Sequence, residues 1–340
     1  MRVLVTGGTG FVGSHAVAAL LAAGHGIRLL VRDPDRIGRA LDPLGVDTGV
    51  VTSEVGDVTD RASVERAMDG CDALLHCASM YSLDRRQARQ VKRVNAQGTG
   101  NVIAEAVRRS LDPIIHVSSI AALLPPDKDE ILTPASRIKN PPGAYLSSKA
   151  DSERIARRHQ QEGHPVVIVN PGGIIGPHDP HVGENTRIIR QVLAAPVAAL
   201  PAGGLNMLDV RDLGQIFARL MEPGHGPRGF VVGRYMTTKE MVDTAASITG
   251  RNLRYRRIPR RLATTIGRIS DALQWVIPAR IPANYEGIYA LVLGAACDDS
   301  GTWRPLGLEP RPIEETFADT IRWMVEAGHL KPEHAGTLAA

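Results

Sequence analysis

A glycine-rich run, TGGTGFVG at Thr6–Gly13, directly follows the short apolar stretch Val3–Thr6 and precedes a helical pattern. This order of strand, tight turn and helix is typical of a loop that holds the pyrophosphate of a dinucleotide. Gly7 permits the turn, Gly10 lets the backbone approach the phosphates, and Gly13 lets helix and strand pack closely. A plain glycine turn is the alternative, but the flanking pattern and the positive end of the following helix favour phosphate binding. The loop residues expected to contact the cofactor are Gly7, Thr9, Gly10, Phe11 and Val12.

The first half of the chain alternates apolar runs with helical patterns. The apolar runs are Val3–Thr6, Ile27–Val31, Ala73–His76, Ile114–Val117 and Val166–Asn170. The helical patterns are Phe11–Ala23, Ala62–Met68, Gln87–Arg109 and Tyr145–Glu162. Strands that alternate with helices and are apolar throughout belong to a parallel sheet covered on both faces. We therefore predict an α/β fold, a Rossmann doubly wound parallel sheet with a smaller C-terminal substrate-binding lobe.

The domain organisation follows from a change of composition after Asn170, where Pro and Gly become frequent. We predict a nucleotide-binding domain over residues 1–170, with one strand returning to its sheet near 229–232. Residues 171–330 should form mainly the substrate-binding lobe. Thr237 and Glu240 fit a capping box that opens a helix to about Ile248, and the final helix should cover Ile313–Glu326. Residues 331–340 are expected to form a flexible tail.

Composition excludes several other classes of protein. The 340 residues are 43% hydrophobic and 22% charged, an ordinary globular balance, and the net charge of +4 is too weak to indicate a nucleic-acid partner. Cys71, Cys77 and Cys297 form no CxxC motif, which suits a reducing compartment. The chain shows no signal-peptide pattern and no apolar run of about 20 residues that could span a bilayer. We expect a soluble, cytoplasmic protein.

The residues after the second apolar run bear on the choice of cofactor. NAD-binding folds usually place a carboxylate at this point, on the adenosine ribose, whereas here Val31 is followed by Arg32. A guanidinium there can hold a 2′-phosphate bidentately, and Arg36 offers a second contact. This favours NADP(H) over NAD(H), although Asp33 could take the ribose hydroxyls instead. Asp57 and Val58 follow the third strand and are expected at the adenine, unless Asp57 merely caps the next helix.

Tyr145 and Lys149 lie four residues apart in a helical segment and therefore share one face. A tyrosine with a pKa near 10 is a poor acid–base group at neutral pH, but a neighbouring ammonium lowers that pKa. Ser119 ends a central apolar run, and open α/β sheets bind ligands at the carboxyl ends of their strands. We interpret Ser119, Tyr145 and Lys149 as a catalytic set for chemistry at a carbonyl oxygen.

Further runs occur in the order typical of one enzyme family. They are HCAS at His76–Ser79, VNAQGTGNV at Val94–Val102, VSSIAA at Val117–Ala122, YLSSK at Tyr145–Lys149, NPGGIIGP at Asn170–Pro177 and LDVRDLGQ at Leu208–Gln215. With the glycine loop, they make residues 1–325 resemble the extended short-chain dehydrogenase/reductases of the NAD(P)-dependent epimerase/dehydratase superfamily. The runs VRDP and SSIAA are most similar to the branch of dihydroflavonol reductases and 3β-hydroxysteroid dehydrogenases.

The resemblance implies a role for each matched residue. Tyr145 would exchange a proton with the substrate oxygen, Ser119 would polarise that oxygen, and Lys149 would tune the tyrosine and bind the nicotinamide ribose. Tyr145 and Lys149 would both also contact the cofactor. The remaining cofactor contacts that the resemblance implies are Cys77, Ala78, Ser79, Pro171 and Ile174. The family often has an aromatic residue shortly after the serine, whereas this chain has Leu123 and Leu124.

Three functional hypotheses remain at this point. We favour an NADP(H)-dependent oxidoreductase that acts on a carbonyl or secondary alcohol of a hydrophobic small molecule. A nucleotide-sugar epimerase or dehydratase with tightly bound NAD would use the same residues. A non-catalytic NADP-binding regulator would not need the Tyr–Lys pair. The family commonly forms dimers, which makes a homodimer one expectation.

Other candidate sites are less specific. His178, Asp179 and His181 share one loop without defined ligand geometry, so we expect no metal site. Asn95 should cap or bridge backbone within its helix. Six arginines lie between Arg251 and Arg261, ahead of Leu262, Ile266, Ile269, Leu273 and Val276 at helical spacing. We favour a basic surface strand followed by a helix packed on the core, over a substrate lid or a contact with an anionic membrane.

Overall fold

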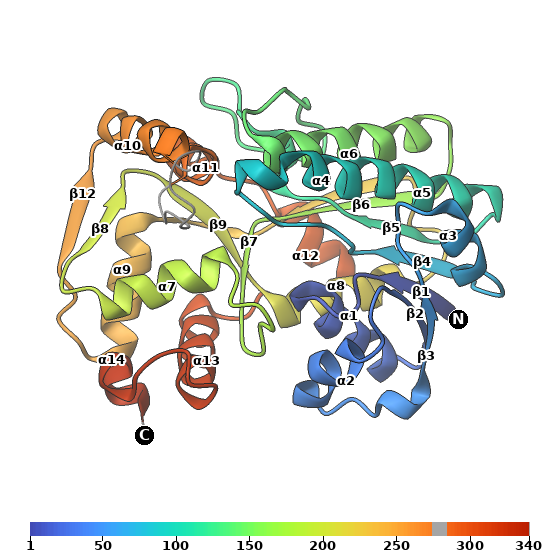
Figure 1. Ribbon diagram of the computed structural model, residues 1–340, viewed down its shortest axis with the longest axis horizontal. Coiled ribbons are helices and arrows are strands. Elements are labelled where there is room, and N and C mark those ends of the chain that lie inside the picture. Colours follow the sequence, from blue (N-terminus) through green and yellow to red (C-terminus); the bar gives the residue numbers. More distant parts are fainter. Residues whose placement is uncertain (274–283, 340) are drawn as a thin grey trace.

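A seven-stranded parallel sheet forms the centre of the larger lobe of the computed structural model, which describes residues 1–273 and 284–339 (Figure 1). The strand order is β10-β6-β5-β4-β1-β2-β3. The strands are β1 Arg2–Thr6, β2 Gly26–Val31, β3 Val51–Val55, β4 Ala73–His76, β5 Ile114–Val117, β6 Val166–Pro171 and β10 Arg228–Val232. Every neighbouring pair in this sheet is parallel, so the predicted doubly wound α/β fold is confirmed.

Helices cover both faces of this sheet (Figure 1). Side chains of the central strands alternate between the two layers. In β1, Val3 and Val5 pack in one apolar cluster and Leu4 in the other. The helices on the first face are α1 Phe11–Ala22, α2 Arg36–Leu41, α8 Val210–Leu220 and α12 Ser300–Leu306. Those on the second face are α3 Arg61–Ala67, α4 Ala88–Lys92, α5 Gly98–Arg108 and α6 Ala144–Gln161. A π-helical turn, Arg93–Gln97, joins α4 to α5.

The smaller lobe contains a three-stranded sheet in the order β11-β9-β7 and a separate parallel pair, β8 and β12. Its strands are β7 Gly173–Ile175, β8 Ala198–Pro201, β9 Gly204–Asp209, β11 Arg234–Thr237 and β12 Tyr255–Ile258. Its helices are α7 Glu184–Ala194, α9 Thr238–Thr249, α10 Arg260–Leu273, α11 Tyr285–Leu293, α13 Ile313–Glu326 and α14 Pro332–Ala335. The predicted capping box is present, because Thr237 and Glu240 each bind the other's backbone N–H.

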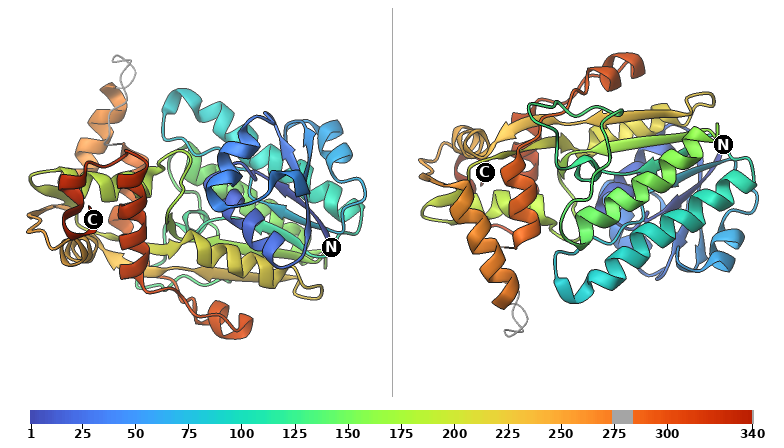
Figure 2. Two further views of the ribbon diagram at one scale, coloured as in Figure 1. Left: turned by 90° about the horizontal axis from the view of Figure 1, so that it is seen from below. Right: turned by 90° about the horizontal axis from the view of Figure 1, so that it is seen from above.

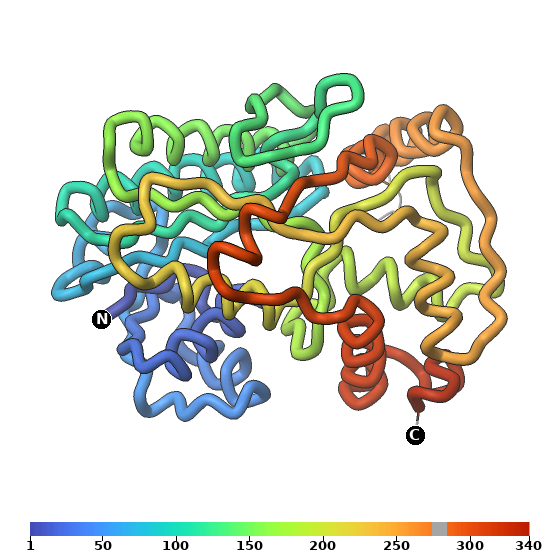
Figure 3. Tube along the Cα trace, turned by 180° about the vertical axis from the view of Figure 1, so that it is seen from behind, coloured from blue at the N-terminus to red at the C-terminus, as the bar shows by residue number. Residues whose placement is uncertain are grey.

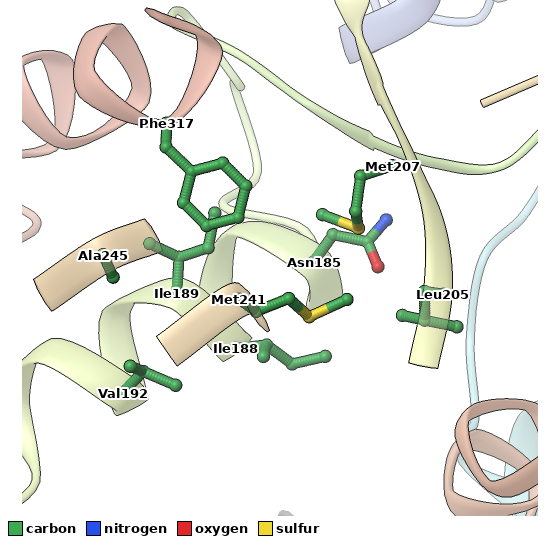
Figure 4. Close-up of a pocket in the computed structure, with 9 residues that line it drawn as sticks. All are labelled: Asn185, Ile188, Ile189, Val192, Leu205, Met207, Met241, Ala245 and Phe317. Carbon is green, nitrogen blue, oxygen red and sulfur yellow. The ribbon is translucent and has the colours of Figure 1, made fainter. Parts of the chain in front are cut away.

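The core of the smaller lobe is closely packed. Side chains from α7, α9, β9 and α13 converge in Figure 4, among them Ile189, Met207, Met241 and Phe317. The space left between them is about 10 Å³, which holds no more than one water molecule. This group is therefore hydrophobic core and not a ligand cavity.

The chain passes repeatedly between the two lobes, as the trace in Figure 3 shows. After β9 it returns to the large sheet through α8 and β10, and it returns again through α12. In α12, the Thr302 hydroxyl donates to the Val231 carbonyl on β10 at 2.7 Å. A segment near the end of the chain is thus attached to the edge strand of the large sheet.

Two expectations differ from the structure. Residues 331–339 do not form a free tail: Ala335 is fully buried, and the Thr337 hydroxyl donates to the Ile248 carbonyl on α9. The helix after the basic stretch does not bury its large apolar side chains. Only small residues of α10 are buried, whereas the expected core residues Leu262, Ile266, Ile269 and Leu273 are exposed. Val276 lies outside the described residues. The structure describes no helix that is long and apolar enough to cross a membrane.

Buried histidines predict a loss of stability in acid. Burial lowers the pKa of His76 to about 3, that of His15 to about 4 and that of His116 well below its usual range. The unfolded chain therefore binds more protons below about pH 6.5, and stability is lost as the pH falls from there towards the folded-state pKa values. Glu286, whose pKa is raised to about 7, and Asp212, whose pKa is raised by burial, oppose this trend, but they are fewer than the three histidines. We expect the melting temperature to fall clearly between pH 7 and pH 5.

His116 offers a test of this acid effect, because neither ring nitrogen has a hydrogen-bond partner among the described residues. Replacing it with leucine removes one buried imidazole and no hydrogen bond. The variant should lose less stability on acidification, by up to about 1.4 kcal/mol per pH unit. Denaturant titrations at several pH values measure this, and an unchanged pH slope would contradict the explanation.

Candidate active site

The glycine loop between β1 and α1 has the shape of a phosphate cradle. Gly7 has a φ of 75°, and its carbonyl accepts the Gly10 backbone N–H at 3.0 Å. A Cβ at Gly13 would lie 2.1 Å from the Gly7 carbonyl oxygen, so this position requires glycine. Helix α1 begins after Gly10 with no side-chain cap and no acidic residue in its first turn. Its N-terminus is therefore available to an anionic group, and the loop fits a dinucleotide pyrophosphate.

A cleft of about 630 Å³ opens beside this loop, at the carboxyl ends of the central strands. It collects every site residue predicted from the sequence. These residues are Gly7, Thr9, Gly10, Phe11, Val12, Arg32, Arg36, Asp57, Val58, Cys77, Ala78, Ser79, Ser119, Tyr145, Lys149, Pro171 and Ile174. The fold thus places the glycine loop and the Ser–Tyr–Lys group in one continuous space, although they are more than a hundred residues apart in sequence.

At the β2 end of the cleft, the lining side chains are basic. Arg32 and Arg36 line the cleft, whereas Asp33 is not among the described lining residues. Asp33 Oδ1 instead accepts the Asp35 backbone N–H at 3.1 Å. Asp57 Oδ1 accepts the backbone N–H and the hydroxyl of Thr59. The N-cap of α3 is Asp60 and not Asp57.

At the other end of the cleft, Ser119, Tyr145 and Lys149 come together. Ser119 follows β5, and its Oγ accepts the Ala121 backbone N–H at 3.1 Å and is hydrogen-bonded to the Tyr145 side chain. Lys149 is buried one helical turn after Tyr145, and its Nζ donates to the Val117 carbonyl at 3.3 Å. The Tyr81 ring packs edge-on against Tyr145, with centroids 4.4 Å apart. Oxygen and nitrogen groups that can donate protons are therefore grouped at one end of the cleft.

The pKa of Tyr145 differs from the sequence-based expectation. Burial, followed by the negative charge of Glu286, raises this pKa above its ordinary value, and the Ser119 hydrogen bond only partly opposes them. Burial also lowers the pKa of Lys149 to about 8, which weakens the ammonium as an electrostatic partner. Tyr145 is therefore a protonated phenol at neutral pH.

Glu286 was not predicted from the sequence, yet it contacts the helix that carries Tyr145. Its carboxylate accepts the backbone N–H of Ala144 at 3.1 Å and that of Leu146 at 2.5 Å, and it also binds the Tyr145 N–H. Helix α6 has no side-chain cap of its own, because its N-cap is Gly143. Burial raises the pKa of Glu286 to about 7. A residue of α11 in the smaller lobe thus caps α6 of the large lobe.

The other residues that were considered as candidates make contacts that stabilise the fold. The Asn95 side chain does bind backbone, but outside its own helix: it binds both backbone groups of Met80, in the loop after β4, and also the Ser148 hydroxyl. Asp179 is buried and holds its own loop, since its carboxylate accepts the backbone N–H groups of His181 and Gly183. Leu123 and Leu124, where the family often has an aromatic residue, are buried in an apolar cluster. Among the described residues, Tyr81 is the aromatic side chain that packs against Tyr145.

Comparisons with known proteins agree with this fold. Residues 3–233 match the model of the NAD dependent epimerase/dehydratase family. The chain is 31% identical over 336 residues to sterol demethylase protein B of Methylococcus capsulatus, covering 97% of this chain and 100% of that protein. It is 28% identical to a putative dihydroflavonol 4-reductase of Synechocystis, covering 97% and 96%.

A solved structure shares the fold. The dTDP-glucose 4,6-dehydratase DesIV of Streptomyces venezuelae, bound to NAD, superposes with a TM-score of 0.74 at 23% identity, covering 98% of this chain and all of that one. The fold and the sequence relatives define an enzyme of the extended short-chain dehydrogenase/reductase type. The chain belongs to the NAD-dependent epimerase/dehydratase family.

Proposed function

We propose that this enzyme is an NADP(H)-dependent oxidoreductase that reduces a carbonyl of a hydrophobic small molecule, or oxidises the corresponding secondary alcohol. The observation that carries this proposal is the position of the Tyr145 phenol. It is protonated, it is bound to Ser119, and it lies one helical turn from Lys149 in the cleft that contains the glycine loop. Bound nicotinamide would supply or accept the hydride.

In the proposed mechanism, each residue acts on the substrate oxygen or on the proton that it receives. The Ser119 hydroxyl orients and polarises the carbonyl by donating a hydrogen bond. Tyr145 donates its proton to the oxygen as negative charge develops there. The Lys149 ammonium stabilises the resulting phenolate, and its burial keeps competing water away. The reverse reaction uses the phenolate as the base.

The residues that would hold the cofactor are those of the glycine loop and the basic end of the cleft. The uncapped N-terminus of α1 suits the pyrophosphate. Arg32 and Arg36 offer guanidinium groups where an NAD enzyme usually has a ribose-binding carboxylate, and Asp33 is already engaged by the Asp35 backbone. These contacts favour the 2′-phosphate of NADP(H).

Names of relatives support a hydrophobic substrate. They include a sterol demethylase component, a dihydroflavonol reductase and a ketoreductase of a farnesyl-dihydroquinoline oxide. In this chain, Met80, Tyr81 and Ile174 line the cleft and offer apolar contacts to such a molecule.

The proposed function is tested by following NADPH oxidation with a panel of ketones and aldehydes that includes sterol-like and flavonoid-like compounds. Turnover in the wild type but not in Tyr145→Phe would support the proposal. Bound NAD released on denaturation, with no NADPH consumption and with conversion of nucleotide sugars, would favour the epimerase or dehydratase reaction instead.

Cofactor preference gives a separate prediction. Arg32→Ala should weaken NADPH binding about tenfold or more, because a charge-assisted contact to the 2′-phosphate is lost, and it should leave NADH binding nearly unchanged. Dissociation constants from fluorescence titration with both cofactors measure the effect. Arg39→Ala serves as the control, since this exposed arginine lies on α2 outside the cleft. An unchanged NADPH-to-NADH ratio in Arg32→Ala would rule out this role.

A further inference from the structure

Helix α10 exposes a stripe of large apolar side chains. Leu262, Ile266, Ile269 and Leu273 follow one another at spacings of four, three and four residues, and they are 52%, 39%, 55% and 44% exposed. Four of the ten large hydrophobic side chains that are exposed in the described chain belong to this one helix. Scattered apolar side chains are normal on a surface, but a continuous stripe on one helix indicates a binding face.

Small residues, in contrast, attach this helix to the rest of the protein. The buried positions of α10 are Ala263, Gly267 and Ser270. A Cβ at Gly267 would lie 2.8 Å from the Tyr285 Cα, so the small residues let α10 pack closely on α11. Figure 2 shows α10, drawn in orange, standing out from the body of the smaller lobe. The helix therefore packs on the protein through its small residues and exposes its large apolar side chains to solvent.

Positive charge surrounds the stripe. The chain has no Asp or Glu from Arg251 to Ser270, and the exposed arginines in and next to α10 are Arg254, Arg256, Arg257, Arg260, Arg261 and Arg268. None of them forms a salt bridge with another residue in the part of the chain that the structure describes. Arg261 and Arg268 are seven residues apart, so they lie on one side of the helix, next to the stripe, and the Arg268 guanidinium also lies over the Tyr285 ring, 5.2 Å from its centroid.

We propose that α10 and the adjoining β12 form a docking surface for an anionic lipid bilayer. The apolar stripe would enter the boundary between headgroups and acyl chains, and the arginines would pair with lipid phosphates. A second copy of this chain is the competing occupant. It fits less well, because a twofold contact through this face would bring two sets of arginines together without acidic partners among the described residues. Docking of this kind would place the enzyme at a source of apolar substrates, although the proposal does not depend on turnover.

The experiment is flotation of the full chain with vesicles of phosphatidylcholine, alone or with about a third of phosphatidylglycerol. We expect binding to the anionic vesicles that is at least tenfold tighter than to the neutral ones and that weakens with added salt. Ile266→Ser/Ile269→Ser and Arg257→Glu/Arg261→Glu should each reduce binding at least tenfold.

Matched control variants change the same kinds of exposed residue elsewhere. Val55→Ser/Ile131→Ser removes apolar side chains that are 56% and 59% exposed, and Arg137→Glu/Arg219→Glu reverses two exposed charges. Both controls should bind anionic vesicles like the wild type, and melting curves should show that all four variants are folded.

Three outcomes would overturn the proposal. One is the absence of binding to anionic vesicles, and another is equal loss of binding in the test and control variants. The third is a dimer, measured by light scattering, that Ile266→Ser/Ile269→Ser dissociates while vesicles bind nothing, which would assign the surface to a second copy of the chain.

Discussion

Replacing Tyr145 with phenylalanine should lower kcat for the proposed carbonyl reduction about a thousandfold, within the range known for loss of a general acid. The phenol is protonated and bound to Ser119, and Lys149 lies one helical turn away on the same face of α6. Phenylalanine keeps the ring and its edge-on contact with Tyr81, so the packing around the site should not change. The loss would therefore come from the missing proton.

Steady-state kinetics and cofactor titration together test this explanation. The dissociation constant for NADPH should stay within about threefold of the wild-type value, because the glycine loop and the basic end of the cleft would supply most of the cofactor contacts. Tyr81→Phe is the matched control, since it removes a neighbouring phenol but keeps the ring contact. If Tyr145→Phe retained a tenth or more of the wild-type kcat, or if Tyr81→Phe lost as much activity, Tyr145 would not be the proton donor.

The large lobe could be predicted from sequence because its strands are buried on both faces. Such strands are apolar along most of their length, and the predicted runs Ala73–His76 and Ile114–Val117 match β4 and β5 residue for residue. The glycine loop was equally readable, since a close backbone approach at Gly13 excludes any other residue. In these regions a short run of sequence is enough to predict the local structure.

The smaller lobe was less predictable because its key contacts join distant segments. Periodicity identified α10 as amphipathic, but it could not tell a face that packs on the core from one that remains exposed. Polar residues after Lys331 suggested a free end, whereas the backbone carbonyl of His334 accepts the Arg251 guanidinium. Glu286 belongs to no motif, and its contact with α6 spans 140 residues of sequence.

Removing the Glu286 carboxylate should affect both stability and catalysis. In Glu286→Ala, the buried N–H groups at the start of α6 lose their acceptor, at a cost of about 1–3 kcal/mol for each group that stays unpaired. A helix end that shifts by about 1 Å would move Tyr145 relative to the substrate and lower kcat by about a hundredfold. Gly143 cannot compensate, because it has no side chain to cap the helix.

The conservative variant Glu286→Gln separates positioning from charge. It keeps one acceptor oxygen for the α6 N–H groups, so its kcat should lie between those of the wild type and Glu286→Ala. Glu240→Gln is the matched control, since Glu240 also accepts a backbone N–H at a helix start, on α9, away from the cleft. This control should leave kcat unchanged.

The pH dependence of stability distinguishes a buried ionisable cap from an ordinary packing contact. The folded-state pKa of Glu286 is about 7, above the unfolded value of about 4.5. The folded protein therefore binds more protons between these values, and the stability contributed by this group is lost as the pH rises through about 7. Relative to Glu286→Gln, the wild type should lose about 3 kcal/mol of unfolding free energy between pH 5 and pH 8. Denaturant titrations of both proteins give this difference directly. A constant difference across that interval would mean that Glu286 does not titrate at the helix end, and Glu286 would then be only a neutral packing contact for α6.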